Sequence, residues 1–246
     1  MERFPNTGNF LRGRLRDHLS EEQKQAIEDL VASVEQYAGG DVLVERGQVC
    51  ERSLILIEGK VLRCISDEED RYTVGIHVPG DFVDLHGFAL KRLDHDIVAV
   101  GPVKVGTVPH DRLEELIARD PVLARVLWFA TLLDAAIHRN WIMMLEKLNA
   151  AQRVAHVFCE LHYRLTLIGR GNARVLRTPL TQQDLAQMCG VTSVHVNRAI
   201  RRLKELDIGE VRRGDFYTSD WAKVCAFAGF KPDYLYGEPP LQLTEI

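Results

Sequence analysis

The chain has 246 residues, a length that predicts two domains. Hydrophobic residues make up 46% of it, which is ample for soluble cores, and no apolar run reaches the ~18 residues that a membrane span needs. The formal net charge is −4, which excludes a uniformly basic nucleic-acid binder and leaves only a local basic region for that role.

The first 37 residues are polar, with one amphipathic stretch that predicts a helix from about Ser20 to Tyr37. No apolar signal core is present there, so we expect a cytoplasmic protein. The cysteines are scattered without a CxxC pair, which argues against a structural zinc site or a disulfide framework. They are Cys50, Cys64, Cys159, Cys189 and Cys225.

Short β-forming runs punctuated by glycine fill residues 41–109. The alternation and the turn residues predict a small β-sandwich or roll. The runs are VLVERG, SLILIEGKVLRCI, RYTVGIHVPGDFV and DIVAVGPVKVGTVP.

A long helix is predicted to begin at Asp120-Pro121, with the aspartate as cap and proline at the first helical position. Apolar residues continue for about seven turns in steps of three and four. They are Leu123, Leu127, Ala130, Leu133, Ile137, Trp141, Met144 and Leu148. Such a seam favours a partner helix from a second copy of the chain, which predicts a homodimer, and the alternative is an internal core helix.

Another helix follows from about residue 150, and then Pro179 to Lys204 predicts two short helices joined by a tight turn. Thr181 and Asp184 can form a capping box at the first helix. Gly190 suits a left-handed turn, and Thr192 or Ser193 can cap the second helix. The apolar residues of the second helix fall at helical spacing and should face the core: Val196, Ala199, Ile200 and Leu203.

The remaining face of that second helix carries side chains that can read base edges or hold phosphates. Residues 208–218 then predict a β-hairpin, or wing, that turns at Arg213-Gly214-Asp215. The alternatives are a solvated helical hairpin and a plain β-hairpin that covers the core. The candidate DNA-binding residues are Thr181, Thr192, Ser193, His195, Asn197, Arg198, Arg201, Arg202, Arg212 and Arg213.

Charge is distributed in agreement with this hypothesis. Residues 170–214 contain nine Lys/Arg and four Asp/Glu, a balance of +5, and the rest of the chain carries −9. Because the local field governs phosphate binding, an acidic chain can still bind DNA through this basic region.

The order of these elements resembles that of the Crp/Fnr superfamily of bacterial transcription regulators. Glu58-Gly59-Lys60-Val61 and Pro79-Gly80-Asp81-Phe82 are similar to turns of its cyclic-nucleotide-binding-like barrel, and LTQQDLAQMCGVTSVHVNRAIRRLKE is similar to its DNA-binding helices. The resemblance spans residues 20–225. It implies an α+β fold with an N-terminal β-roll or jelly-roll sensor barrel, a long dimerisation helix and a C-terminal winged helix-turn-helix.

The resemblance also implies domains. We expect the barrel with its N-terminal helix in residues 1–119, the dimerisation helix in 120–148 and the DNA-binding domain in 149–246. Family members act as homodimers on double-stranded DNA, and contacts with RNA polymerase help to decide between activation and repression. A roughly palindromic site, with two recognition helices one DNA turn apart, is therefore expected.

The barrel departs from the cyclic-AMP-responsive members of the family. Those members have a Gly-Glu pair after the PGDF-like turn and an Arg-Ser/Thr pair some ten residues later. Here Asp84-Leu85 and His95-Asp96 stand in those regions, and a carboxylate would repel a cyclic phosphate. Lys91 or Arg92 could compensate only through a different loop path. We therefore expect no dependence on cyclic AMP, with a small-molecule effector of unknown class as a candidate partner at Asp84, Leu85, His86, Gly87, His95 and Asp96.

Other sensors of the family find less support. The oxygen-sensing branch holds an iron–sulfur centre on clustered N-terminal cysteines, and this chain has none before Cys50. Haem binding would have His77, His86 and His95 as candidates, and a redox switch would have Cys50 or Cys64, but isolated side chains of these types are usually packed residues. We expect no cofactor. In the recognition helix, Val194 stands where familiar members have glutamate, so the DNA target should differ.

Two competing functions remain open. An enzyme or a metal-binding protein on a cupin-like barrel would need two nearby histidines and a carboxylate, and the barrel has no HxH pair. We expect neither catalytic residues nor metal ligands. A ligand- or partner-binding module that has lost DNA binding is the other alternative, and the intact set Arg198, Arg201 and Arg202 argues against it.

Overall fold

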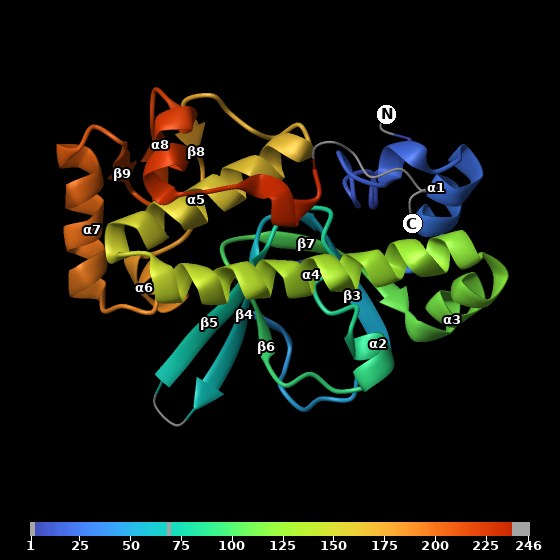
Figure 1. Cartoon of the computed structure of the whole chain (residues 1–246). Coiled ribbons are helices and arrows are strands. Elements are labelled where there is room, and N and C mark those ends of the chain that lie inside the picture. The colour runs from blue at the N-terminus through green and yellow to red at the C-terminus, as the bar shows by residue number, and fades with distance from the viewer. Residues whose placement is uncertain (1–2, 68–69, 238–246) are drawn as a thin grey trace.

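The computed structural model describes residues 3–67 and 70–237. Residues 68–69 and the proline-containing end of the chain, 238–246, lie outside the described residues. Figure 1 shows helices α6 (Gln182–Met188) and α7 (Ser193–Glu205) at one end of the molecule and helix α3 (His110–Arg119) at the other.

The N-terminal half is built from two antiparallel sheets, as the β-forming runs predict. One sheet has the strand order β1-β7-β3, with β1 at Ser33–Tyr37, β7 at Val103–Pro109 and β3 at Arg52–Glu58. The other has the order β2-β6-β4-β5, with bounds Val42–Val44, Asp96–Ala99, Val61–Asp67 and Asp70–His77. Apolar side chains of both sheets, among them Ile55, Leu62 and Ile97, are fully buried, so the barrel interior is a packed core.

The predicted helix from Ser20 to Tyr37 is wrong in its second half. Ser20 caps helix α1 through a capping box, but α1 covers only Glu21–Glu28. The chain then extends, and Ser33–Tyr37 pairs with Val103–Thr107 of β7. A place at the edge of a sheet satisfies the backbone of this segment and overrides its weak helical pattern.

Helix α3 (His110–Arg119) leads into α4 (Pro121–Lys147), whose first turn is capped by Asp120 through the amides of Val122 and Leu123. The predicted apolar seam of α4 faces the interior of the chain. Its members Leu123, Leu127, Leu133, Ile137, Trp141 and Met144 are buried within this chain, so the seam belongs to the internal core and its assignment to the dimer contact was wrong. A single period of three and four residues cannot say which partner covers it.

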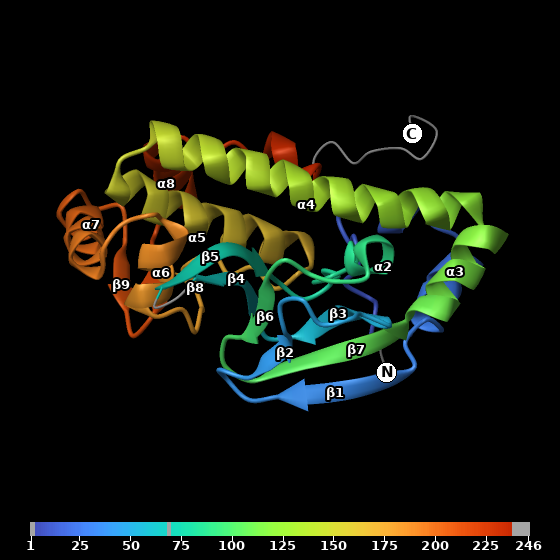
Figure 2. The same cartoon turned by 90° about the horizontal axis from the view of Figure 1, so that it is seen from below.

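The opposite face of α4 is also apolar, and it is exposed. Trp128 and Ile142 are each 66% exposed and Leu132 is 52% exposed. Figure 2 shows α4 along one edge of the molecule, with the strands of the barrel on its other side. By length and composition alone α4 could cross a membrane, but its inner face packs within the fold.

The C-terminal half packs around helix α5 (Ala150–Leu167). Strands β8 (Val175–Leu176), β10 (Asp215–Tyr217) and β9 (Glu210–Arg212) form a small sheet, and Phe158 of α5 stacks on Phe216 at 4.6 Å between ring centroids. The other elements are α6 (Gln182–Met188), α7 (Ser193–Glu205), α8 (Trp221–Ala228) and the 3-10 helix Pro232–Leu235. The N-terminal half also contains two short helices, a 3-10 helix at Arg16–His18 and α2 at Gly87–Leu90.

Candidate nucleic-acid interface and sensor site

Helices α6 and α7 form the helix-turn-helix that the sequence predicts. Thr181 and Asp184 make the expected capping box at α6, and Thr192 caps α7. Gly190, in the turn between them, has φ +61°, and a Cβ there would lie 3.2 Å from Leu145. A left-handed backbone and a close neighbour both explain why glycine fits this turn.

The two faces of α7 divide as predicted. Val196, Ala199 and Leu203 are buried against the rest of the domain. The polar candidates of this helix are exposed: Ser193, His195, Asn197, Arg198, Arg201 and Arg202. Exposed side chains from consecutive turns of one helix are the arrangement that a major groove can receive.

The exposed cationic side chains of this surface differ in whether they already form an ion pair within the chain. Arg202 lies 3.4 Å from Glu205, and Lys204 lies 2.7 Å from Glu210. Arg198 and Arg201 make no hydrogen bond or ion pair to any residue that the structure describes. These two guanidinium groups are therefore available to a ligand without first breaking an internal ion pair.

The wing turns where the sequence predicts, between β9 and β10. Arg213 and Gly214 have φ +53° and +90°, as a two-residue hairpin turn requires. Arg213 is exposed at the tip, whereas Arg212 forms an ion pair with Glu210 and packs over the Tyr217 ring. Hydrogen bonds from Arg212 and Lys204 lower the pKa of Glu210 to about 2, so this carboxylate offsets part of the positive charge of the wing.

Sequence reasoning missed a contact between the helix-turn-helix and the barrel. Arg71 of β5 donates to Asp184 of α6 at 2.9 Å and to Gln187 at 3.4 Å, and Thr73 donates to the same Gln187 oxygen at 2.9 Å. No local pattern marks Arg71, because its partners lie more than a hundred residues away. Helix α6, the first of the helix-turn-helix, is thus docked on the β-barrel of the same chain.

The residues predicted to bind an effector differ in their surroundings. Asp84 is fully buried and accepts the Leu54 amide at 2.6 Å, and Leu85 and Gly87 are also buried. Asp96 instead accepts the Arg46 amide at 2.7 Å. His86 and His95 do come together, with their ring centroids 5.2 Å apart.

Burial is the largest influence on the pKa values of Asp84, His86 and His95. It raises the pKa of Asp84 to about 7, even though the Leu54 amide and Arg63 favour the carboxylate. Burial, helped by the charge of Arg63, lowers the pKa of both His86 and His95 to about 4. At neutral pH these two histidines are uncharged and supply no positive charge for an anionic ligand.

Arg63 is the buried cation of this region, and the sequence did not single it out. Its guanidinium lies 2.8 Å from Asp134 and 3.3 Å from His138, both on α4, and donates to the Val83 carbonyl at 3.1 Å. Although burial raises the pKa of Asp134, the charge of Arg63 holds it below its usual range. The barrel is therefore tied to the long helix through a charge that is already neutralised.

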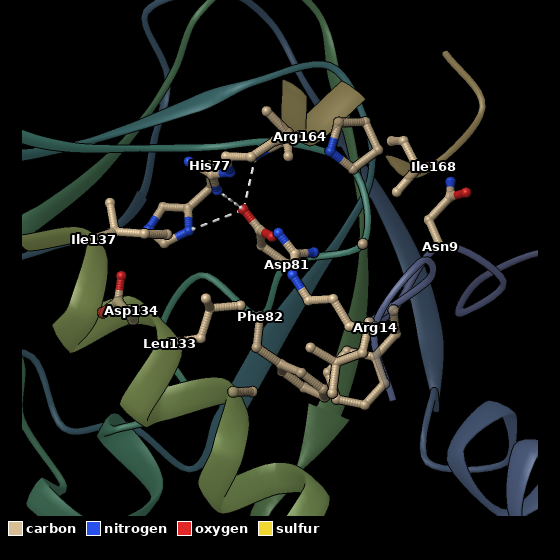
Figure 3. Close-up of a pocket in the computed structure, with 16 residues that line it drawn as sticks. Asn9, Arg14, His77, Asp81, Phe82, Leu133, Asp134, Ile137, Arg164 and Ile168 are labelled. Carbon is tan, nitrogen blue, oxygen red and sulfur yellow. Dashed lines mark hydrogen bonds and ion pairs between the residues drawn. The ribbon is translucent and has the colours of Figure 1, made fainter. Parts of the chain in front are cut away.

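A small cavity of about 40 Å³ lies where the PGDF turn meets α4, α5 and the N-terminal segment (Figure 3). Asp81 projects into it and pairs with Arg164 of α5, and His77 lies 3.5 Å from the same carboxylate. These contacts lower the pKa of Asp81 to about 2 against the effect of burial. The space suits a few water molecules and is far smaller than a nucleotide.

Tight packing also explains the glycine of that turn. Gly80 has φ +98°, and a Cβ at this position would lie 2.3 Å from the carbonyl oxygen of Asn9. Within residues 3–67 and 70–237, no three His, Cys, Asp or Glu side chains gather as a set that could hold a metal ion. The described geometry thus gives the cupin-like alternative no support.

Comparisons with known proteins agree with this architecture. A model of the Crp-like helix-turn-helix domain matches residues 152–227, and a model of the cyclic nucleotide-binding domain matches residues 34–120. The transcriptional activator protein FnrA of Stutzerimonas stutzeri is 24% identical over 213 residues, which cover 86% of each chain. The fumarate and nitrate reduction regulatory protein of Yersinia pestis is 25% identical over 199 residues, covering 79% of this chain and 78% of that protein.

Solved structures share the fold. FixK2 from Bradyrhizobium japonicum superposes with a TM-score of 0.72 at 21% identity, over 80% of this chain and 97% of that one. A CRP/FNR-family transcriptional regulator from Thermus thermophilus gives a TM-score of 0.64 at 20% identity, over 80% and 99% of the two chains. The two matched ranges contain the barrel and the helix-turn-helix in that order, and the long helix α4 lies between them.

Proposed function

This chain belongs to the Crp/Fnr family of DNA-binding transcription regulators, and we propose that it acts as a homodimer on a two-fold-symmetric DNA site without requiring cyclic AMP. The family consists of regulators rather than enzymes, and a cytoplasmic location with RNA polymerase as a further partner is part of the same proposal. The observation that carries the DNA-binding role is the exposed face of α7, where Arg198 and Arg201 have no internal partner among the described residues.

The position of each side chain along α7 decides whether we expect it to contact a base edge or a phosphate. Residues of the first turns, including Asn197 and Arg198, would reach base edges, and Arg201 and Arg202 would hold phosphates. Thr181 and Thr192 stand at the N-termini of the two helices, where exposed amides and side chains can meet a phosphate. Arg213 at the wing tip would contact the backbone, whereas Arg212 would first have to share its charge with Glu210.

Independence from cyclic AMP is supported by the charges in the barrel. The carboxyl of Asp84 is fully buried in the barrel, and with a pKa of about 7 it is partly ionised at neutral pH. His95, in the region of the expected arginine, is neutral at that pH, and Arg63 is already paired with Asp134. No spare positive charge in this group offsets the desolvation of a cyclic phosphate.

Dimerisation is supported by the outer face of α4. Trp128, Leu132, Ala135, Arg139 and Ile142 follow one another in steps of four and three residues, the spacing of a coiled-coil seam. Three of them are large apolar side chains that are more than half exposed. A second copy of the helix would remove this surface from water.

Ile142→Glu tests the dimer. An uncompensated buried charge in the seam costs about 3 kcal/mol or more, so we expect the dimer dissociation constant to rise on the order of a hundredfold. Analytical ultracentrifugation would then show the 27.9 kDa chain in place of a species of twice that mass. Leu90→Glu is the matched control, because Leu90 is 63% exposed on α2, away from this face. A wild-type chain that binds DNA tightly as a monomer would refute the proposal.

A further inference from the structure

Two of the five cysteines meet inside the DNA-binding domain, although the sequence places them 66 residues apart. The Sγ atoms of Cys159 on α5 and Cys225 on α8 are 3.5 Å from each other. Cys159 is 1% exposed, whereas Cys225 is only partly buried. The pair therefore consists of one fully buried cysteine and one that is partly exposed.

The elements that carry the pair are fixed to one another on both sides of it. Trp221, at the start of α8, stacks on His162 of α5 with ring centroids 3.7 Å apart. At the other end of α8, the Phe227 carbonyl accepts a hydrogen bond from Gln152 of α5 at 3.2 Å. An S–S bond of about 2.05 Å needs an approach of roughly 1.5 Å, which side-chain rotation and a small shift of α8 can supply.

The remaining cysteines have different surroundings. The Cys50 thiol lies 3.7 Å from the Gln48 carbonyl, and the Cys64 thiol lies 4.0 Å from the Thr73 hydroxyl. Cys189 is fully buried at the end of α6, and burial raises its pKa to about 12. They serve as internal controls for the reactivity of the pair.

We propose that Cys159 and Cys225 are a redox-active thiol pair that a hydroperoxide converts into an intrachain disulfide. The Cys225 thiolate attacks one peroxide oxygen, the O–O bond breaks, and the sulfur becomes a sulfenic acid while the second oxygen leaves as water after taking up a proton. The Cys159 sulfur then attacks the sulfenic sulfur, the S–O bond breaks, and a second water leaves. Two thiols lose two electrons in total, and one hydrogen peroxide becomes two waters.

The charge distribution within the pair suits these roles. Contact with the Cys159 thiol lowers the pKa of Cys225, because a neighbouring S–H can donate to its thiolate. The same contact, together with burial, raises the pKa of Cys159. The partly exposed sulfur is thus the first nucleophile, and the buried sulfur resolves the sulfenic acid.

A Cys159–Cys225 disulfide would affect the stability of the DNA-binding domain because of where it lies in the chain. The segment between Cys159 and Cys225 contains α6, α7 and both strands of the wing, so a disulfide closes a loop around the whole DNA-binding unit. Closing a loop of this length restricts the unfolded chain. Oxidation should therefore stabilise the domain in its present packing, and dithiol reduction should reverse the effect.

Peroxide treatment of the full-length protein tests the pair directly. After stoichiometric hydrogen peroxide, digestion without reductant and mass spectrometry should find a peptide that joins Cys159 to Cys225. The midpoint of thermal unfolding should rise by several degrees and return with dithiothreitol. Cys225→Ser should abolish both effects, whereas Cys189→Ser should keep the linked peptide.

A second variant separates the two steps. In Cys159→Ala the resolving sulfur is missing, so Cys225 should accumulate as a sulfenic acid that dimedone captures. The proposal is overturned if peroxide gives no Cys159–Cys225 peptide, if the wild-type and Cys159→Ala proteins trap dimedone equally, or if the only disulfides formed join two chains.

Discussion

At the scale of single residues, the barrel keeps ionisable groups in places where water does not reach them. Asp84 is fully buried, with one oxygen on the Leu54 amide and the other without a partner among the described residues. Such a group costs free energy when it is charged, and the protein bears that cost near neutral pH.

Asp84→Asn should therefore stabilise the protein at high pH. The folded-state pKa of Asp84 is about 7 against an ordinary 3.8, so between these values the folded chain holds a proton that the unfolded chain has released. Stability falls as the pH rises through this window and stays lower above it. At pH 8 the variant should gain about 1–3 kcal/mol, and the gain should vanish near pH 4. Urea unfolding at several pH values measures this, and a gain independent of pH would disprove the assignment.

Two arginines of α7 should respond differently to truncation. Arg198→Ala should cost about 1–3 kcal/mol on the preferred site and relax the choice of base at one position, because a bidentate contact to guanine is lost. Arg201→Ala should weaken all sequences alike and reduce the salt slope by about one. Fluorescence anisotropy with specific and random duplexes at several salt concentrations distinguishes them. Unchanged operator binding by Arg198→Ala would show that α7 is wrongly oriented.

At the scale of elements, α4 has two apolar faces, one buried within the chain and one exposed. The inner face packs inside the chain and the outer face is exposed, so one helix can join the sensor barrel to a second copy. The ion pair between Arg63 of β4 and Asp134 of α4 connects the barrel to that helix. A change in the barrel at this point would be passed to the proposed dimer seam on the other side of the helix.

The contact between β5 and α6 is a second link, and Arg71→Ala tests its strength. The Arg71–Asp184 pair is partly exposed, so global stability should change by less than about 1 kcal/mol. Local opening should change more, and hydrogen exchange of the α6 amides should become several-fold faster. Arg46→Ala is a suitable control, because Arg46 donates to the Ser66 carbonyl of the barrel instead. Equal exchange in the two variants would mean that this contact does not hold α6.

At the scale of the whole molecule, several polar contacts join the barrel to the DNA-binding domain. Arg71 reaches Asp184, Lys60 donates to the Arg177 carbonyl at 3.2 Å, and Asp81 pairs with Arg164. The third is buried, and beside it Arg14 of the N-terminal segment donates to the Leu235 carbonyl at 2.7 Å. A rotation of the DNA-binding domain against the barrel must break these contacts, so they set the free-energy cost of any such change.

Sequence patterns predicted the parts of this molecule that depend on local chemistry. The capping box at Thr181, the left-handed Gly190 and the wing turn at Arg213 are all determined by neighbouring residues, and the structure has each of them. The strands of the barrel followed from alternation and glycine turns. The roles of the α7 side chains and the effector residues stay predictions.

What could not be predicted depends on distant partners. Ser33–Tyr37 is a strand because β7 offers an edge, and the α4 seam is internal because the barrel and α5 cover it. Arg63, Arg71 and the Cys159–Cys225 pair have no local signature, since each meets a partner 66 or more residues away. Contacts of this range are a property of the fold rather than of a sequence window.

DNA selection with the purified protein, at fixed salt and with and without cyclic AMP, tests the central claim most directly. We expect one palindromic site with half-sites about one helical turn apart, enriched equally in both conditions. Enrichment only with cyclic AMP would contradict our interpretation of Asp84 and His95. An enriched site without two-fold symmetry would contradict the dimer, and the absence of any enriched site would contradict sequence-specific binding by the free protein.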